Sequence, residues 1–420
     1  MSTLNQPSNI RAANPVLYLS NAPLPLIYIF VNPSSGGNSA GAITNIGIHQ
    51  FTFSEPDLQS HVFIYNIRDG EHGNKPGFTD MKERVDKHEA DAVPVHVVIA
   101  GGDGTVMWAI SEAQAHGVDM TKIAFGVIPY GTGNDFARSL GWGGSSPGSN
   151  VMNGGMKVFK KLIREYLRAE VVDFDIWNIE MRVTEDGGKI KQVKEGKKVV
   201  MKDGEMDRKV LSKPMCNYFS VGIESRVGLG FDKKRTTSTF GNKLRYVIEG
   251  VKKSMTSTPR INDLIKECTI DAEGSSTTLF HTGNESPRLI GNPISLIFLN
   301  INSFAGGCDL WAKASKTGLS PPVADDLSMS QSTGDGKLEI LTYQRLFSLS
   351  LEQTKNKVFG GNGQRVSQAR GPLNLKFRDD LDTKRTYMQI DGEFFTLDKC
   401  ESVTIKHNMV VKVLRKRPKS

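Results

Sequence analysis

The stretch VVIAGGDGTV, from Val97 to Val106, decides the fold of this 420-residue chain. It begins as a short apolar run, typical of a buried strand, and the run ends at three glycines around Asp103. The residues from Val106 to His116 then predict a helix. A strand that leads through glycines into a helix start presents free backbone N–H groups, and this geometry binds phosphate. The carboxylate in the same turn indicates a metal ion, a hydroxyl group or a ribose nearby, so the turn is typical of a site that transfers phosphate.

Two further glycine-rich turns follow predicted strands in the same half of the chain. The strand predicted at residues 26–31 leads into NPSSGG, and the strand predicted at 123–128 leads into PYGTGN. Ligands of parallel sheets bind outside the carboxyl ends of the strands, so we expect the three turns to converge on one crevice. Each turn taken alone is also compatible with an ordinary connection, and Asn134 with the cap of a helix predicted at 135–140.

The pattern of predicted elements changes near residue 170. Before this point strands alternate with helices, which predicts a mainly parallel sheet with helices on both faces. After it, short strand-like runs separated by turns predict a sandwich or a split barrel. Residues 181–213 carry ten Lys/Arg and six Asp/Glu, and we interpret them as an exposed, partly disordered hairpin or loop. The expected helices are 81–90, 106–116, 135–140, 157–167 and 244–253, and residues 272–292 are expected to form a loop.

Composition and charge limit the class of protein. No apolar run reaches the roughly 20 residues that a bilayer-spanning helix needs, and the N-terminus lacks the pattern of a secretory signal. The four cysteines form no CxxC pair, so we expect reduced thiols in the cytosol rather than zinc modules. The formal net charge of +8 fits nucleic acid, an anionic membrane or a phosphorylated ligand as partner, or general solubility alone.

Three motifs together closely resemble the catalytic domain of diacylglycerol kinases: VNPSSGG at 31–37, VVIAGGDGTV at 97–106 and VIPYGTGNDFARSLGWG at 127–143. The same superfamily includes sphingosine kinases, ceramide kinases and bacterial lipid kinases and, more distantly, phosphofructokinases and NAD kinases. Further matches resemble the accessory domain of the eukaryotic family. They are NYFSVGIESRVGLGFDKKR at 217–235, FGNKLRYVIEG at 240–250, NINSFAGGCDLW at 300–311, GDGKLEIL at 334–341 and MQIDGEFF at 388–395.

The resemblance implies a lipid kinase of two lobes with the active-site cleft between them. The N-terminal lobe would be α/β, with a parallel, doubly wound sheet like that of NAD kinases and phosphofructokinases, and the C-terminal lobe mainly β. We expect a mobile tail at 1–23, an ATP-binding catalytic domain at 24–170 and an accessory β-rich domain at 171–401 that contains the polar insertion 181–213. A C-terminal segment at 402–420 is expected to return to the first lobe and to end in a basic tail.

The resemblance also implies roles for individual residues. Asp103 and the glycine amides would hold the ATP phosphates and Mg²⁺, while Asn32 and Thr132 would contact the nucleotide. The residues expected to bind the cofactor are Asn32, Ser35, Gly36, Gly37, Gly101, Gly102, Asp103, Gly104, Thr105, Gly131, Thr132 and Asn134.

The base that accepts the proton of the lipid hydroxyl would be Asp391 of the DGE motif, with Glu393 beside it, or Asp103. Asp391 is also compatible with a simple turn before a glycine. Asp335 is the candidate for a structural Mg²⁺ ion. This chain has Gly334 where many eukaryotic members have a first acid, and the pair Asp325–Asp326 is a candidate substitute.

The predicted function is an ATP-dependent diacylglycerol kinase that produces phosphatidic acid at the membrane surface. The alternatives are a sphingosine or ceramide kinase of the same fold and a non-catalytic lipid or nucleotide sensor. We expect a cytoplasmic protein, peripherally bound to an anionic membrane through residues 406–420 and Lys233–Arg235, with no nucleic acid partner. A solvated tail is the alternative for the basic residues. Because the cysteine-rich modules of animal diacylglycerol kinases are missing, we expect a stand-alone catalytic unit.

Overall fold

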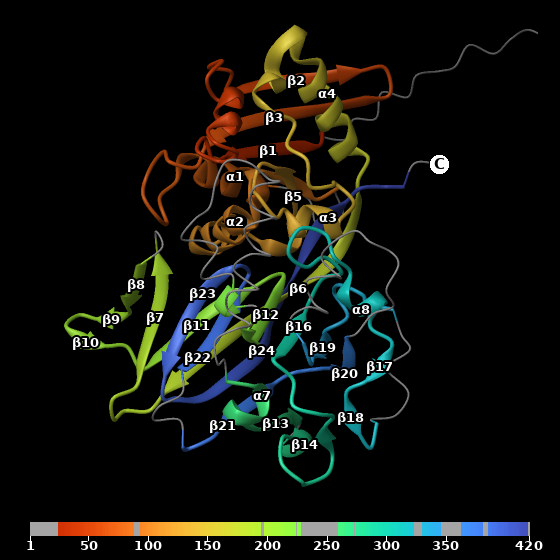
Figure 1. The fold of residues 1–420 in the computed structure, drawn as a ribbon. Coiled ribbons are helices and arrows are strands. Elements are labelled where there is room, and N and C mark those ends of the chain that lie inside the picture. Colours follow the sequence, from red (N-terminus) through yellow and green to blue (C-terminus); the bar gives the residue numbers. More distant parts are fainter. Residues whose placement is uncertain are drawn as a thin grey trace, which may run out of the picture.

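The computed structural model describes residues 24–87, 93–194, 197–223, 225–227, 259–272, 274–322, 330–345, 363–380 and 385–418. The predictions for residues 1–23, the helix at 244–253, Lys233–Arg235 and Asp325–Asp326 lie outside these ranges. Within them, an N-terminal α/β region is followed by a mainly β region (Figure 1). The predicted change of architecture is therefore confirmed.

The N-terminal region is built on a mainly parallel sheet in the order β2-β3-β1-β4-β5. Every residue of β4 is buried, as expected for a parallel strand covered on both faces. The consecutive side chains of Val97 and Val98 point to opposite faces of the sheet and belong to two separate hydrophobic clusters. The strands are β1 (Leu26–Val31), β2 (Gln50–Glu55), β3 (Leu58–Asn66), β4 (Val95–Gly101) and β5 (Ile123–Pro129).

Helices cover both faces of this sheet. Phe78 of α1 and Ile110 of α2 pack in one cluster, and Phe159 of α4 packs in the other. The helix predicted at 81–90 begins earlier, because Pro76 supplies a favourable first helical residue. The helices are α1 (Pro76–Asp86), α2 (Asp103–Ala115), α3 (Asp135–Ser139) and α4 (Asn153–Leu167), with short 3₁₀ helices η1 (Ser39–Ile43), η2 (Met120–Lys122) and η3 (Ser149–Met152).

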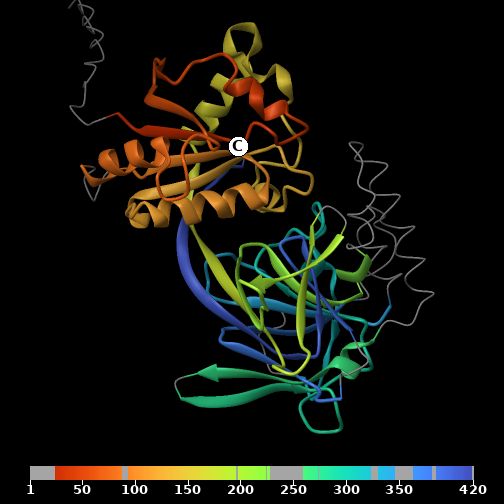
Figure 2. The same ribbon diagram turned by 90° about the vertical axis from the view of Figure 1, so that its left-hand side faces the viewer.

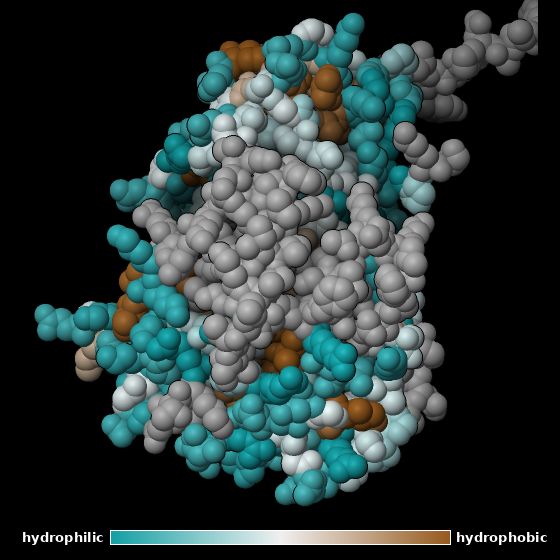
Figure 3. Space-filling view, viewed as in Figure 1, coloured by the Kyte–Doolittle hydropathy of each residue, from teal (hydrophilic) through white to brown (hydrophobic). Residues whose placement is uncertain are grey.

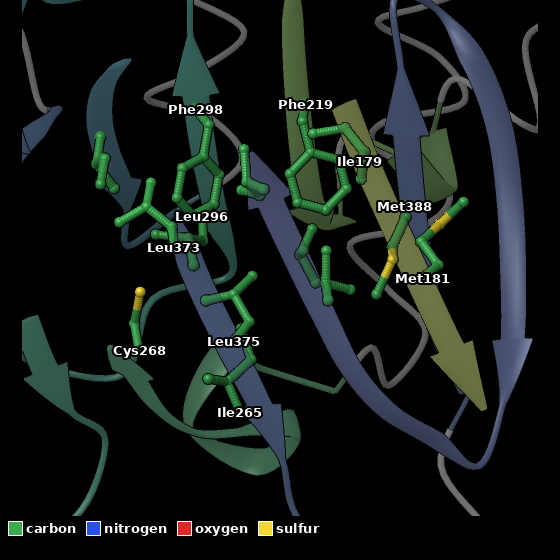
Figure 4. Packing of buried hydrophobic residues seen from close by; sticks show 14 of the residues in the cluster. Ile179, Met181, Phe219, Ile265, Cys268, Leu296, Phe298, Leu373, Leu375 and Met388 are labelled. Atoms are coloured by element: carbon green, nitrogen blue, oxygen red, sulfur yellow. The ribbon is translucent and has the colours of Figure 1, made fainter. Parts of the chain in front are cut away.

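The mainly β region contains two sheets that share a core. Figure 4 shows Leu373 and Leu375 of β21 beside Leu296 and Phe298 of β16, which belong to different sheets. One sheet has the order β17-β20-β19-β16-β12-β22-β23-β7-β8, and the other contains β18-β15-β14-β13-β21-β24.

The bounds of the elements in this region are as follows. The strands are β6 (Glu170–Val183), β7 (Lys189–Lys194), β8 (Lys197–Val200), β9 (Lys202–Asp203), β10 (Met206–Asp207), β11 (Val210–Met215), β12 (Tyr218–Gly222), β13 (Ile265–Ala272), β14 (Ser275–His281), β15 (Arg288–Leu289), β16 (Ser295–Leu299), β17 (Lys316–Thr317), β18 (Leu319–Ser320), β19 (Leu338–Tyr343), β20 (Gln364–Ala369), β21 (Leu373–Phe377), β22 (Arg385–Ile390), β23 (Glu393–Asp398) and β24 (Cys400–Arg415). The short helices are α7 (Ile261–Leu264) and α8 (Leu310–Lys313).

Two long strands connect the regions. β6 and β24 pair along their whole lengths, and the far end of β24 joins the N-terminal sheet parallel to β5, with Lys412 opposite Ala124. Figure 2 shows β24 as the long blue strand that runs from one region into the other. Near its start β24 pairs with β21 of the mainly β region, and near its end it pairs with β5. A bulge between His407 and Met409, which lies between these two pairings, interrupts the β6–β24 register. The two regions are therefore joined by continuous hydrogen-bonded backbone.

The segment 181–213, interpreted as an exposed, partly disordered hairpin or loop, contains the β7–β8 hairpin, whereas the loop expected at 272–292 is wrong. Most of the segment 181–213 forms strands, and β7 adds to the sheet by pairing with β23. In the described residues β8 forms the edge of this sheet, and its lysines fit an edge strand, where charges discourage further pairing. The expected loop at 272–292 contains β14, which pairs antiparallel with β13. The first residues of β14 are Ser and Thr and are mostly exposed.

The surface seen in Figure 3 is mostly hydrophilic where it is described, and the hydrophobic residues lie in small, separate groups. The large apolar side chains are instead concentrated in the cores. In the described residues, no helix has the length and apolar character needed to cross a membrane.

Candidate active site

The three glycine-rich turns converge on one pocket at the carboxyl ends of β1, β4 and β5. Its volume is about 950 Å³, which is within the range of small-molecule sites. The predicted residues that line it are Asn32, Ser35, Gly36, Gly37, Gly102, Gly104, Thr105, Gly131 and Thr132. The lining also includes Ile67, Trp108, Tyr130, Arg138, Gly144, Ser145 and Ser146, which were not predicted.

Close packing within one turn explains Gly101, and close packing between two turns explains Gly102. A Cβ on Gly101 would lie 2.7 Å from the Thr105 side chain, and a Cβ on Gly102 would lie 3.1 Å from the Cα of Gly131. The turns also hydrogen-bond, since Asn32 Nδ2 donates to Thr105 Oγ1 at 3.3 Å. Larger residues would therefore separate the turns and widen the cradle of backbone N–H groups at the start of α2.

The Asp103 carboxylate forms its hydrogen bonds away from the pocket lining. Its Oδ2 accepts hydrogen bonds from the backbone N–H of Asp135 and from Nδ2 of Asn217, both at 3.0 Å. Its Oδ1 is shielded from solvent and has no partner among the described residues. Burial, together with the negative charges of Asp135 and Asp391, raises the pKa of Asp103 to about 7. This carboxyl can therefore gain or lose a proton near neutral pH.

Asp135, which was not predicted as a site residue, joins the two regions from the start of α3. Its Oδ1 accepts hydrogen bonds from Ser303 Oγ and from the backbone N–H groups of Gly306 and Gly307. Its Oδ2 accepts one from Tyr218 Oη at 3.1 Å. The donors all come from the mainly β region, so this carboxylate is satisfied only when the two regions are docked.

Asp391 occupies the two-residue turn between β22 and β23. Its φ of 48° and the φ of 83° at Gly392 fit a type I′ hairpin, for which Asp-Gly is a preferred sequence. The carboxylate accepts hydrogen bonds from the backbone N–H groups of Cys216, Asn217 and Tyr218 at 2.8–3.0 Å. Burial raises its pKa, although these donors oppose the shift. Asp391 thus holds the start of β12 in place.

Asn217 connects Asp391 to Asp103. Its backbone N–H donates to Asp391 while its side-chain amide donates to Asp103. The residue is 1% exposed and was not predicted as a site residue. The signal that could have found it is its place at the start of the NYFSVG motif, just as Asp135 follows directly on PYGTGN.

Two predicted residues, Glu393 and Asn134, lie elsewhere or act differently. Glu393 is half-exposed, and its carboxylate binds the side chains of Lys213 and Gln192. It takes no part in the hydrogen bonds around Asp103. Asn134 does not cap α3 with its side chain; instead Nδ2 donates to the carbonyls of Gly131 and Gly144 and fixes the turns. Asn134 stands at the N-cap position of α3, but the alternative that its side chain caps the helix is wrong, and its predicted contact with the cofactor stays a prediction.

The candidate metal residue Asp335 accepts a hydrogen bond from the backbone N–H of Lys337. Across the described ranges, no group of three or more His, Cys, Asp or Glu side chains is arranged to hold a metal ion. The same loop is fixed by Asp175, whose Oδ2 accepts from the N–H of Gly336 at 2.7 Å. A hydrogen-bonded acid therefore supports this loop.

The basic C-terminal residues are partly neutralised. Arg415 pairs with Glu170 at 2.9 Å, and Lys416 pairs with Glu165 at 2.8 Å and lies over the Trp142 ring. These contacts reduce the uncompensated positive charge of this segment.

The fold and the pocket define a class of protein with a glycine-rich pocket at the carboxyl edge of a parallel sheet, the usual place of ligands in such sheets, beside a second, mainly β region. Residues 26–160 match the family model of the diacylglycerol kinase catalytic domain, and residues 214–394 match that of the diacylglycerol kinase accessory domain. The chain belongs to the diacylglycerol kinase family.

Curated relatives agree with this assignment. The chain is 26% identical to "Probable diacylglycerol kinase 3" of Caenorhabditis elegans over 94% of its length and 44% of that protein. It is 28% identical to the eye-specific diacylglycerol kinase of Drosophila melanogaster over 87% of its length and 21% of that protein. It is 26% identical to diacylglycerol kinase zeta of Rattus norvegicus over 88% of its length and 34% of that protein. The chain thus spans less than half the length of these relatives.

Proposed function

We propose that this protein is an ATP-dependent diacylglycerol kinase that transfers the γ-phosphate of ATP to the free hydroxyl of diacylglycerol and so forms phosphatidic acid. One observation carries the proposal: the Asp103 carboxylate lies at the junction of a glycine-lined pocket and the mainly β region, with Oδ1 unpartnered. The names of the relatives support the lipid.

In this proposal the pocket binds ATP. The backbone N–H groups at the start of α2 and in the turns of Ser35–Gly37 and Gly131–Thr132 would hold the phosphates, because a helix N-terminus favours anions. Ile67 and Trp108 provide apolar surface elsewhere in the pocket for the base. The lipid headgroup would enter where the two proposed lobes meet at Asp103. We place these lobes at 24–170 and 171–401, with residues 402–420 returning to the first.

Asp103 is the group that we propose as the proton acceptor. A general base works best when its pKa lies near the working pH and it has a lone pair free toward the hydroxyl. Asp103 has a pKa raised to about 7 and one oxygen without a hydrogen-bond partner in the described residues, whereas both oxygens of Asp391 already accept backbone N–H groups. We therefore assign Asp391 to positioning and give Glu393 no part in the proton transfer.

Magnesium would enter with ATP. The ion usually keeps several waters and binds substrate phosphates with one or two carboxylates, so it does not require a complete protein cage. The unpartnered oxygen of Asp103 is assigned to the proton of the hydroxyl, so the ion would be held mainly by the ATP phosphates and by water. The ion would neutralise charge on the phosphates. We extend the proposal to a cytoplasmic protein that binds the membrane peripherally, through its lipid substrate and its net charge of +8.

The test is a lipid kinase assay. The purified chain is incubated with labelled ATP, Mg²⁺ and mixed micelles that contain diacylglycerol, ceramide, sphingosine or monoacylglycerol. Label in phosphatidic acid is expected. Label in ceramide or sphingosine alone would contradict the substrate, and no labelled lipid in any arm would contradict the activity.

Asn variants separate the two candidate bases. Asp103→Asn should lose turnover and keep nucleotide binding, because the pocket lining is unchanged. Asp391→Asn should lower thermal stability, because an amide cannot accept all three backbone N–H groups. Asp379→Asn, at an exposed position, is the matched control. Near-normal turnover by Asp103→Asn with full loss in a stably folded Asp391→Asn would reverse the assignment.

A further inference from the structure

Arg138 is a cationic side chain in the pocket that the sequence analysis did not single out. It belongs to α3 and lines the pocket together with Gly131, Thr132 and Gly144. Its Nε donates to the carbonyl oxygen of Gly133 at 3.0 Å, which fixes the plane of the guanidinium. In the described part of the chain, no carboxylate forms an ion pair with it. The terminal N–H groups therefore remain available to an anionic ligand.

Two glycines show where the guanidinium lies. A Cβ on Gly144 would be 1.9 Å from one terminal nitrogen of Arg138, and a Cβ on Gly307 would be 3.2 Å from the other. Gly144 follows α3 in the N-terminal region, and Gly307 lies in the loop between β16 and α8 of the mainly β region. The guanidinium therefore lies against both regions at the edge of the pocket.

The neighbouring helical turn engages the same loop. Asp135 and Arg138 are three residues apart on α3, a spacing that places side chains on one face of a helix. Asp135 accepts from the backbone N–H groups of Gly306 and Gly307, and Arg138 lies against Gly307. Docking of this loop onto α3 thus fixes the position of the arginine.

We propose that Arg138 binds the distal phosphates of the nucleotide in the pocket. An arginine presents a planar fork of N–H donors that matches two phosphate oxygens, and these charge-assisted hydrogen bonds are stronger than neutral ones. Phosphoryl transfer depends mostly on positioning and on neutralising charge at the phosphates. Arg138 would supply a fixed cation for both purposes, on the side of the pocket that borders Gly307. The proposal rests on the proposed use of ATP.

The proposal is tested by measuring the affinity of the full chain for ATP, ADP and AMP by calorimetry. Arg138→Ala is expected to weaken ATP binding by about tenfold or more, as befits hydrogen bonds to a charged group, and to change AMP binding much less. Arg138→Lys keeps the charge but not the fork, so it should restore only part of the affinity. Equal loss for ATP and AMP, or wild-type affinity for ATP in Arg138→Ala, would overturn the proposal.

Gly144→Ala provides a second variant that keeps the arginine. Its Cβ would occupy the position of the guanidinium and displace the flexible end of Arg138. ATP affinity should fall in the same direction as in Arg138→Ala, and unchanged affinity for ATP would count against the proposal. Arg168→Ala is the control, since Arg168 is exposed and pairs with Asp57 on the surface. If the wild-type chain binds none of the three nucleotides, the proposed function fails; if it binds ATP and the variants bind it equally well, only the role of Arg138 fails.

Discussion

The side-chain amide of Asn217 donates a hydrogen bond to the carboxylate of Asp103 at 3.0 Å, across a sequence separation of 114 residues. One residue lies at the start of α2 and the other just before β12. The backbone N–H of the same asparagine donates to Asp391. A single buried asparagine therefore sets the relative position of two carboxylates, through its side chain and its backbone, where the α/β region meets the mainly β region.

Asn217→Ala should lower turnover while leaving the fold intact. The variant removes one of the two donors to Asp103 Oδ2 but keeps the backbone N–H that Asp391 accepts. Loss of a hydrogen bond to an ionised group costs about 1.5–3 kcal/mol, and we expect a fall in kcat of about tenfold or more. Steady-state kinetics measure the fall in turnover, and circular dichroism checks that the fold is intact.

Asn178→Ala is the matched control, because Asn178 also donates through its side chain, to Ser212, but on the exposed surface. Its activity should equal that of the wild type. Full activity in Asn217→Ala would show that Asp103 is positioned without this amide.

The pH profile of the reaction should reflect the carboxyl group of Asp103. A base must be ionised to accept a proton, so kcat/KM should fall as the pH drops below about 7, the pKa to which burial raises this group. Asn217→Ala should move this limb to higher pH, because the lost hydrogen bond favours the ionised form. Rates from pH 5.5 to 9 at constant ionic strength provide the measurement. A flat profile over this range would contradict the role of Asp103.

The turn at Gly101–Asp103 could be predicted because its signals are local. A continuous apolar strand, glycines and a helix start follow one another within a few residues. Gly102 and Gly104 of this turn line the pocket. The lining by Asn32 and Thr132 follows from the same rule, since the carboxyl ends of neighbouring parallel strands meet at one edge.

The roles of Asp135 and Asn217 could not be predicted from local pattern. The partners of their side chains in the other region are between 83 and 172 residues away along the chain, and the pairing of β6 with β24 is what joins the two regions. An aspartate at a helix start and an asparagine before a strand are ordinary in sequence. The extent of strand structure in 181–213 was underestimated for another reason: the many charged residues of β7 and β8 weaken the alternation of apolar and polar side chains.

Glu112→Ala should weaken ATP binding through the loop that contains Ile67. The Glu112 carboxylate is 1% exposed and accepts hydrogen bonds from the backbone N–H of Gly73 and from the ring of His72. Lys75, at the end of this loop, in turn donates to the carbonyl of Ile67, which lines the pocket. We expect the KM for ATP to rise about fivefold, equivalent to about 1 kcal/mol, with a smaller change in kcat.

Glu112→Gln keeps one carbonyl acceptor and should recover part of the affinity. Glu83→Ala, at an exposed position of α1, serves as the control. An unchanged KM in a folded Glu112→Ala variant would mean that the loop holds its shape without the carboxylate.

Glu339→Gln should stabilise the protein at neutral and alkaline pH. Glu339 is fully buried on β19, and burial raises its pKa to about 8 from an ordinary value of 4.5. Below pH 4.5 the residue is protonated in both the folded and the unfolded state. Between pH 4.5 and about 8 only the folded state keeps the proton, so its contribution to the free energy of unfolding falls as the pH rises.

Glutamine is neutral at every pH and can still accept the hydrogen bond from Nε2 of Gln368. The variant should therefore be more stable than the wild type by up to about 3 kcal/mol at pH 7 and by little near pH 4.5. Urea unfolding of both proteins between pH 4.5 and 9 measures the difference, with the exposed Glu401→Gln as control. A difference that stays constant across this range would show that Glu339 keeps the same charge in the folded and the unfolded state.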